Sequence, residues 1–109
     1  MINVARELFI QAQRHKWTIT VMYDEEPGYD GRSAAEAWRA VTDVSARTIS
    51  TASGVSDDVF VHFHDADGKN IGWVRVCAYG LEPDETIIDG SAVGPVADLS
   101  DKICALAWK

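Results

Sequence analysis

Hydrophobic residues recur at helical spacing in three segments of the chain. Between residues 3 and 14, apolar residues at three- and four-residue steps alternate with polar residues, the pattern of a helix with one buried face. Ser33 opens the sequence SAAE, where its hydroxyl can accept from the Glu36 amide while the Glu36 carboxylate reaches back to the Ser33 amide. Pro95 suits a first helical position and precedes a third apolar stripe. The pattern therefore predicts three helices.

Other segments alternate apolar and polar residues with a period of two, as strands do. Residues 17–23 and the two arms of a hairpin within 59–79 follow this pattern, and 86–88 reads as a short further strand. Residues 24–31 are rich in Pro and Gly and are predicted to form a loop. Residues 48–51 are interpreted as either a weak edge strand or an exposed loop.

The order of these elements predicts the fold class. Strands joined by short turns favour antiparallel pairing, and helices beside such a sheet make a two-layer α+β domain. We expect an antiparallel sheet of about four strands, ordered helix, strand, helix, weak strand, three strands, helix, with the helices packed on one face. A length of 109 residues with 47% hydrophobic and 25% charged residues fits one domain spanning residues 1–109.

The hairpin carries the residues most suggestive of chemistry. Its turn, DADGK, places Gly68 where a type I turn followed by a bulge needs positive φ. The register predicted from this turn pairs Phe63 with Ile71, Val61 with Trp73, Val59 with Arg75, His62 with Gly72 and His64 with Asn70. It places the two histidines on one face together with Phe60, Val74 and Val76.

Two ion-binding interpretations of the hairpin differ in strength. A calcium loop with Gly68 at its sixth position would put Phe63 first and Val74 twelfth, so both outer ligands are missing. His62 and His64, two apart on a strand, can chelate one metal, but no Cys-x-x-Cys or His-Glu-x-x-His motif supplies further ligands. A small metal-binding module or metal-dependent enzyme using this pair stays open as an alternative.

Other catalytic motifs are missing from the sequence. It contains no glycine-rich phosphate loop, and its Ser, His and Asp residues show no arrangement specific to a catalytic triad. We therefore expect a non-enzymatic protein without a cofactor.

The charge balance limits the class of partner. Seventeen acidic and ten basic residues give a net charge of −7, which disfavours direct binding to nucleic acid or anionic membranes. The same charge suits a protein partner with a basic surface. No apolar run approaches a membrane span and the N-terminal segment lacks the pattern of a secretory signal, so a cytoplasmic protein is expected.

The acidic residues cluster, and three of the clusters, with two aromatic residues, form the predicted partner-binding set. A rigid array of carboxylates has the electrostatic pattern of a phosphate backbone and could occupy another protein's nucleic-acid groove. The aromatic members are candidate hot spots, whereas Trp17, Trp38 and Trp73 follow core stripes. The predicted partner-binding residues are Asp24, Glu25, Glu26, Tyr29, Asp57, Asp58, Glu82, Asp84, Glu85 and Trp108.

The segments DADGKNIGWVRV and PDETIIDGS, in the C-terminal half, give the chain a family resemblance. It resembles small proteins encoded by bacteriophages and other mobile elements, in which a hairpin with a Gly-Trp start to its second strand precedes a short acidic strand. Anti-CRISPR inhibitors are a functional class among small acidic phage proteins, and several bind the nucleic-acid groove of a surveillance complex. The resemblance implies this class but assigns no functional residue.

The leading expectation is therefore a non-enzymatic inhibitor or adaptor that binds a basic protein surface, with a nucleic-acid-binding complex as the expected kind of partner. A second alternative, besides the metal site, is an oligomerisation module in which the hairpin face with Phe60, Val74 and Val76 pairs with another copy. Both a monomer and a homodimer are compatible with the sequence.

Overall fold

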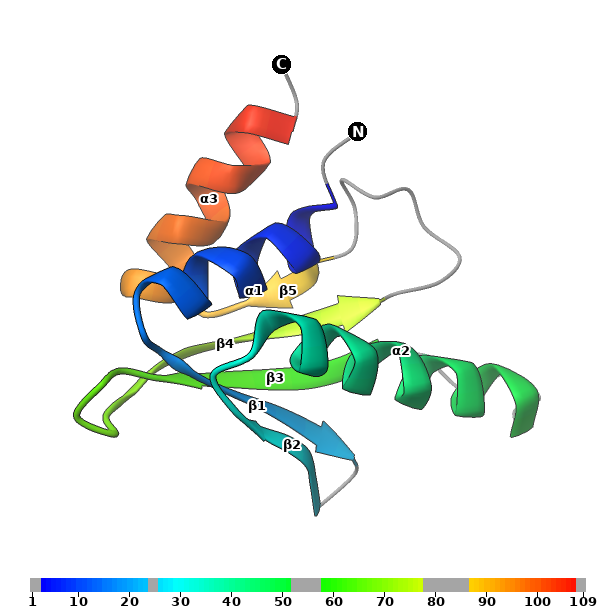
Figure 1. Cartoon of the computed structure of the whole chain (residues 1–109). Helices are drawn as coiled ribbons and strands as arrows, with labels where there is room; N and C mark the ends of the chain where they lie inside the picture. The colour runs from blue at the N-terminus through cyan, green and yellow to red at the C-terminus, as the bar shows by residue number, and fades with distance from the viewer. Residues whose placement is uncertain (1–2, 24–25, 52–57, 78–86, 108–109) are drawn as a thin grey trace.

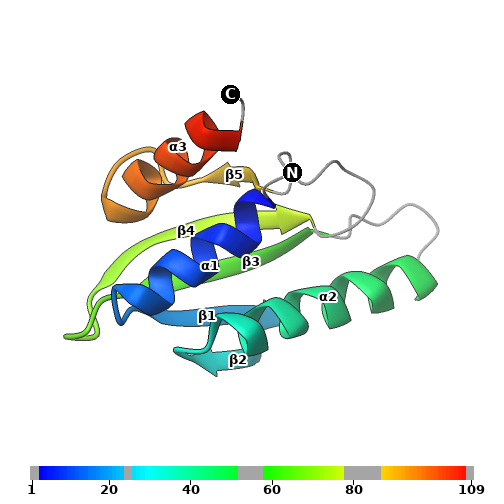
Figure 2. The same cartoon turned by 45° about the horizontal axis from the view of Figure 1, so that its top comes forward.

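Helices cover one face of an antiparallel sheet (Figures 1 and 2). The computed structural model describes residues 3–23, 26–51, 58–77 and 87–107, and within these ranges it contains three helices and five strands. In chain order these elements are α1 (Val4–Arg14), β1 (Thr18–Tyr23), β2 (Glu26–Gly31), α2 (Ala34–Thr51), β3 (Asp58–His64), β4 (Asn70–Cys77), β5 (Ile87–Gly90) and α3 (Pro95–Ala107). The predicted α+β class with helices on one face is confirmed.

The strand order in the sheet is β2-β1-β3-β4-β5. β1 pairs with β2 in one hairpin, and β3, β4 and β5 follow one another as an antiparallel meander. The two groups join where β3 pairs with β1, after α2 has crossed over the sheet. In Figure 2, α1 lies between α2 and α3 on the covered face. None of the three described helices lies over the opposite face (Figure 1).

β2 occupies a segment for which the sequence predicted a loop. Glu26–Gly31 pairs along β1, and Gly28 is an extra residue between the pairs Met22 with Pro27 and Val21 with Tyr29. Proline cannot donate to a sheet ladder and is therefore confined to edges and bulges. Because β2 is an edge strand with a bulge, it tolerates the residues that made 24–31 look like a turn.

The predicted weak strand at 48–51 is wrong, because these residues are the last turn of α2. Ser and Thr have low intrinsic helix propensity, but extending an existing helix costs far less than starting one. The remainder of that segment, 52–56, lies outside the described residues. No helix within the described ranges combines the length and apolar character that a bilayer span requires.

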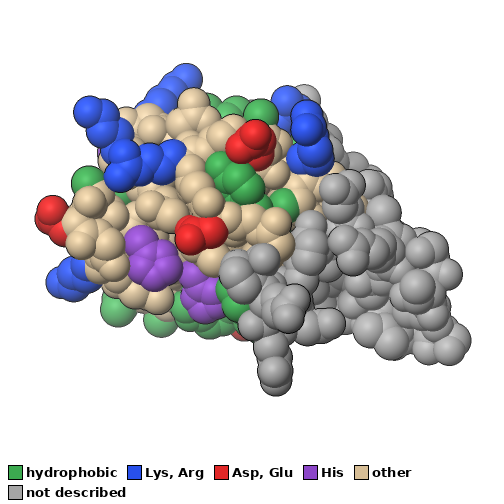
Figure 3. All heavy atoms as spheres, turned by 60° about the horizontal axis from the view of Figure 1, so that its bottom comes forward, with side chains coloured by type: hydrophobic (Ala, Val, Ile, Leu, Met, Phe, Trp, Pro, Cys, Tyr) green, Lys and Arg blue, Asp and Glu red, His purple; other side chains and the backbone are tan. Residues whose placement is uncertain are grey.

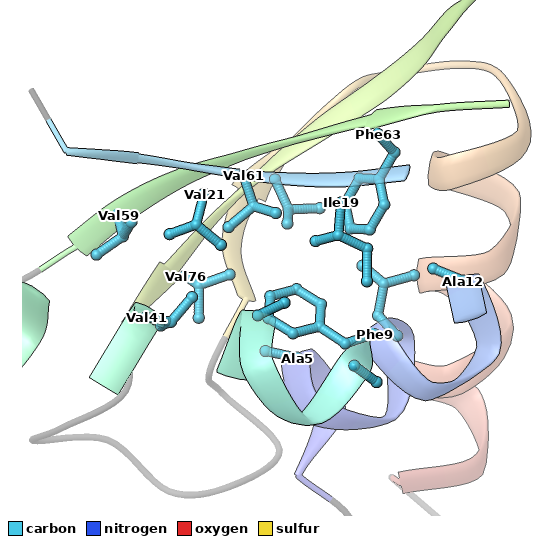
Figure 4. Close-up of a cluster of buried hydrophobic side chains, with 14 of the residues drawn as sticks. Ala5, Phe9, Ala12, Ile19, Val21, Val41, Val59, Val61, Phe63 and Val76 are labelled. Atoms are coloured by element: carbon cyan, nitrogen blue, oxygen red, sulfur yellow. The ribbon is translucent and has the colours of Figure 1, made fainter. Parts of the chain in front are cut away.

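The core lies between the sheet and the helices (Figure 4). Strand side chains such as Val61 and Phe63 point toward α1 and α2, where Phe9 meets them. Phe9 packs edge-on against Trp38 at 6.0 Å and against Phe63 at 6.1 Å between ring centroids. One aromatic side chain thus joins α1, α2 and β3. Trp17 and Trp38 pack against this core as predicted.

The β3–β4 register differs from the predicted one over most of the hairpin. His64 pairs with Asn70 as expected, but Ile71 is an extra residue at a bulge, and the remaining pairs are shifted by one. The observed pairs are Val59 with Val76, Phe60 with Arg75, Val61 with Val74, His62 with Trp73 and Phe63 with Gly72. A shift of one residue moves a side chain to the other face. Val74 and Val76 are therefore buried in the core, whereas Trp73, which was predicted to be a core residue, lies on the opposite face of the sheet.

Three side chains bind the first amides of α2. Ser33 Oγ accepts from the Glu36 amide at 3.2 Å, which confirms half of the predicted capping box. The Ser33 amide donates to Tyr29 Oη at 2.9 Å instead of to the Glu36 carboxylate. Gln13 Oε1, from α1, accepts from the Ala34 amide at 2.7 Å. The start of α2 is therefore fixed by residues from α1 and β2 as well as by its own cap.

Replacing Lys16 by glycine is expected to stabilise the protein by about 0.5–1 kcal/mol. Lys16 has φ of 61° at the end of α1, where its amide donates to the Gln13 carbonyl and the Trp17 amide donates to the Ala12 carbonyl. This is a Schellman motif with lysine at the position that usually holds glycine. Glycine removes the strain of a left-handed side-chain-bearing residue, partly offset by its greater freedom when unfolded. Urea denaturation measures the gain.

Lys16→Ala is the matched control, because it removes the charge but keeps the Cβ. It is expected to show no gain. Equal stability of the two variants would contradict the strain at Lys16.

Candidate functional site

The face of the sheet without helices is called here the open face. Strand alternation directs onto it the side chains that pair across the sheet away from the core. Figure 3 views this side and shows histidine side chains (purple) beside one another, with an acidic side chain (red) close by. The open-face residues are Thr18, Thr20, Met22, Asp30, Phe60, His62, His64, Trp73, Arg75 and Asp89.

An aromatic pair with a cation occupies the centre of the open face. The Phe60 ring is 48% exposed and lies 5.8 Å from the Trp73 ring between centroids. The Arg75 guanidinium carbon lies 5.6 Å from the centroid of Phe60. Aromatic residues and arginine are enriched at the centres of protein interfaces, where they supply most of the binding energy.

The two histidines share the open face, as predicted, but lie among groups that are not metal ligands. His62 stands between Thr20 and Trp73 on the neighbouring strands, and His64 stands opposite Thr18 and Asn70. Across the part of the chain that the structure describes, no three His, Cys, Asp or Glu side chains come together as a group able to hold a metal ion. The alternative of a metal site at His62 and His64 therefore gains no third ligand there.

The strand ends that adjoin the predicted acidic clusters lie at one end of the sheet, called here the acidic end. β1 ends at Tyr23, which pairs with Glu26 at the start of β2, and β3 starts at Asp58, which pairs with Cys77 at the end of β4. β5 starts at Ile87, which pairs with Val76, the residue before Cys77 in β4. The arrowheads of β1 and β4 in Figure 1 point to this end. The β3–β4 turn lies at the opposite end of the sheet (Figure 1).

Only some of the predicted partner-binding residues fall within the described ranges. Glu26 and Asp58 are the first residues of β2 and β3, so their backbones lie at the acidic end. The residues outside the described ranges are Asp24, Glu25, Asp57, Glu82, Asp84, Glu85 and Trp108. Their predicted roles stay predictions.

The described contacts of Tyr29 are structural. Its ring packs against the core, and its hydroxyl accepts from the Ser33 amide. The side chain is half-buried and on the covered side of the sheet, opposite Val21. A role for Tyr29 in partner binding stays a prediction, and its described contacts are those of a packing residue.

Two grooves on the helical side run along α1. The groove of about 290 Å³ between α1 and α2 is lined by Arg6, Ile10, Gln13, Ala34, Ala35 and Trp38. The groove of about 150 Å³ between α1 and α3 is lined by Leu99, Ile103 and Leu106 together with Glu7, Gln11, His15 and Lys102. The lining residues Arg6, Gln13 and Trp38 of the first groove include no nucleophile and base.

Sequence reasoning missed Trp73 and Arg75 as open-face residues because it missed the bulge at Ile71. A signal was present, since an isolated glycine in a strand often marks a bulge and Gly72 follows Ile71 directly. Gly72 has φ of 146°, which alanine and larger residues rarely adopt.

Comparison of the chain with protein-family models, with curated proteins and with solved structures finds no match in any of the three.

Proposed function

We propose that this protein is a non-enzymatic inhibitor or adaptor that binds a basic protein surface through carboxylates gathered at the acidic end of its sheet. The observation that supports the proposal is the position of the strand ends. Tyr23, Glu26, Asp58, Cys77 and Ile87 all lie at that end, and each of the three predicted acidic clusters adjoins one or two of them in sequence. Clusters distant in sequence are thus connected to one small region of the scaffold.

The paired strand ends give the flanks of the acidic clusters fixed positions. Neighbouring strands lie about 4.8 Å apart, so the backbones of adjacent strand ends lie within the Debye length of about 8 Å at physiological salt. We propose that the fields of the carboxylates that flank adjacent strand ends add. A basic partner is steered toward this end, and less entropy is lost on binding than with an unstructured acidic tail.

The net charge of −7 also selects among partners. Nucleic acids and a second copy of the chain carry the same sign and are repelled at long range. A basic protein groove that normally holds a nucleic-acid backbone has the complementary charge. We therefore propose that the partner is a nucleic-acid-binding protein or complex, which agrees with the anti-CRISPR class implied by the resemblance.

A charge-neutralised variant tests this proposal. Asp24→Asn/Glu25→Gln/Asp57→Asn changes the net charge from −7 to −4, since three acids are removed. With a partner captured from a lysate of the source organism, the association rate is expected to fall on the order of tenfold and to depend less on salt. Surface plasmon resonance at several ionic strengths measures both effects.

The matched control is Asp67→Asn/Asp98→Asn/Asp101→Asn, which also changes −7 to −4. These three residues are exposed at the β3–β4 turn and on α3, away from the acidic end. An equal loss of association rate in both variants would mean that only net charge matters. Failure of a cognate oligonucleotide to displace the chain from its partner would contradict competition for a nucleic-acid site.

A further inference from the structure

We infer that the open face is the apolar anchor of this protein for the same basic partner, held through Phe60 and Trp73. The inference rests on the proposed function for the nature of the partner. It adds a second contact surface that works by burial of aromatic area and not by charge steering.

The aromatic centre is not needed to complete the core. Phe9 and Phe63 fill the space between sheet and helices, whereas Phe60 points away from it with 48% of its surface exposed. Its contacts in the described structure are with Trp73 and Arg75 beside it on the open face. Two aromatic rings and a guanidinium held side by side on the central strands lose little conformational freedom on binding.

Charge on the open face favours a cationic protein over other occupants. Asp30 and Asp89 are exposed on strands either side of the aromatic centre. Asp89 lies directly across from Arg75, whereas Asp30 accepts a hydrogen bond of 3.0 Å from Thr20 Oγ1. A lysine or arginine of the partner can place its ammonium or guanidinium group on the Asp30 carboxylate while its alkyl stem covers the rings. A second copy, with its own net charge of −7, and a phosphate backbone are both disfavoured.

The open face is continuous with the acidic end. Phe60 lies two residues from Asp58 at the start of β3, and Arg75 lies two residues from Cys77 at the end of β4. One rigid partner can therefore contact both surfaces without a change in the fold.

Phe60→Ala tests the inference, with Leu106→Ala as its matched control. Leu106 is 51% exposed and lies on α3, on the helical side. Phe60→Ala is expected to raise the dissociation rate roughly 10- to 100-fold, with the salt dependence of association unchanged. Leu106→Ala is expected to leave both rates as in the wild type.

A second variant, Thr20→Arg, keeps both aromatic rings and adds a cation beside His62 and Asp30. It is expected to weaken binding of the basic partner by a similar factor. Urea denaturation of each variant verifies that the fold is retained before its kinetics are compared.

The outcomes separate this inference from the proposed function. Unchanged dissociation in Phe60→Ala, together with slower association in the Asp24, Glu25 and Asp57 variant, would overturn the anchor and leave the proposed function standing. Faster dissociation in Phe60→Ala with no effect of the acidic variant would overturn the proposed function and the basic character of the partner. A concentration-dependent dimer in light scattering that Phe60→Ala abolishes would overturn the inference by assigning the open face to a second copy.

Discussion

Gly72→Ala is expected to destabilise the protein by about 2–5 kcal/mol, a large part of the 5–15 kcal/mol typical of a small domain. Gly72 has φ of 146°, where a side chain is strained. A Cβ added there would lie 2.7 Å from the Cβ and 2.9 Å from the Cγ2 of Val96, which is fully buried at the start of α3. The clash would separate α3 from β4. The free energy of unfolding from urea titration measures the loss.

Gly68→Ala separates the backbone strain at positive φ from the clash with Val96. Gly68 has φ of 85°, but a Cβ there meets nothing within 4 Å. This variant is expected to lose only the backbone strain, about 1–2 kcal/mol. If Gly72→Ala were no less stable than Gly68→Ala, the close approach of β4 to α3 would not be required by the fold.

Phe9→Ala is expected to cost about 3–5 kcal/mol of stability. Phe9 is fully buried, and its ring contacts Trp38 of α2 and Phe63 of β3 edge-on. Removing it leaves a cavity where three elements meet and also loses the two aromatic pairs. Thermal and urea denaturation, followed by circular dichroism, measure the effect.

Phe60→Ala is the matched comparison for Phe9→Ala, because a phenylalanine side chain is removed from the open face of the sheet and not from α1, which packs on the covered face. Phe60 is nearly half exposed and is not part of the core, so its loss is expected to cost about 1 kcal/mol or less. A similar loss for both variants would contradict the assignment of the two faces. The comparison also shows whether Phe60→Ala is folded well enough for the binding test.

Local sequence determined the elements whose signals are confined to neighbouring residues. The apolar stripes predicted α1 and α3, and Pro95 begins α3 as expected. Ser33 caps α2, and the DADGK turn holds Gly68 at positive φ. Helix caps and tight turns act over three or four residues, so they can be recognised without knowledge of the fold.

The edge strand, the end of α2 and the hairpin register depended on distant residues. Pro27 and Gly28 look like a turn until β1 provides a ladder, and the Ser33 amide is bound by Tyr29 and not by Glu36. The register of β4 depends on the close packing of Gly72 against Val96, 24 residues further along the chain. No local pattern contains that contact.

For the candidate surfaces, the sequence by itself determined the net charge, the acidic clusters and the shared face of His62 and His64. Only the tertiary structure placed Trp73 and Arg75 beside Phe60, because one bulged residue reverses which side of a strand faces the core. It also placed the flanks of three separate acidic clusters at one end of the sheet. In an antiparallel sheet, the end of each strand lies beside the start of its neighbour.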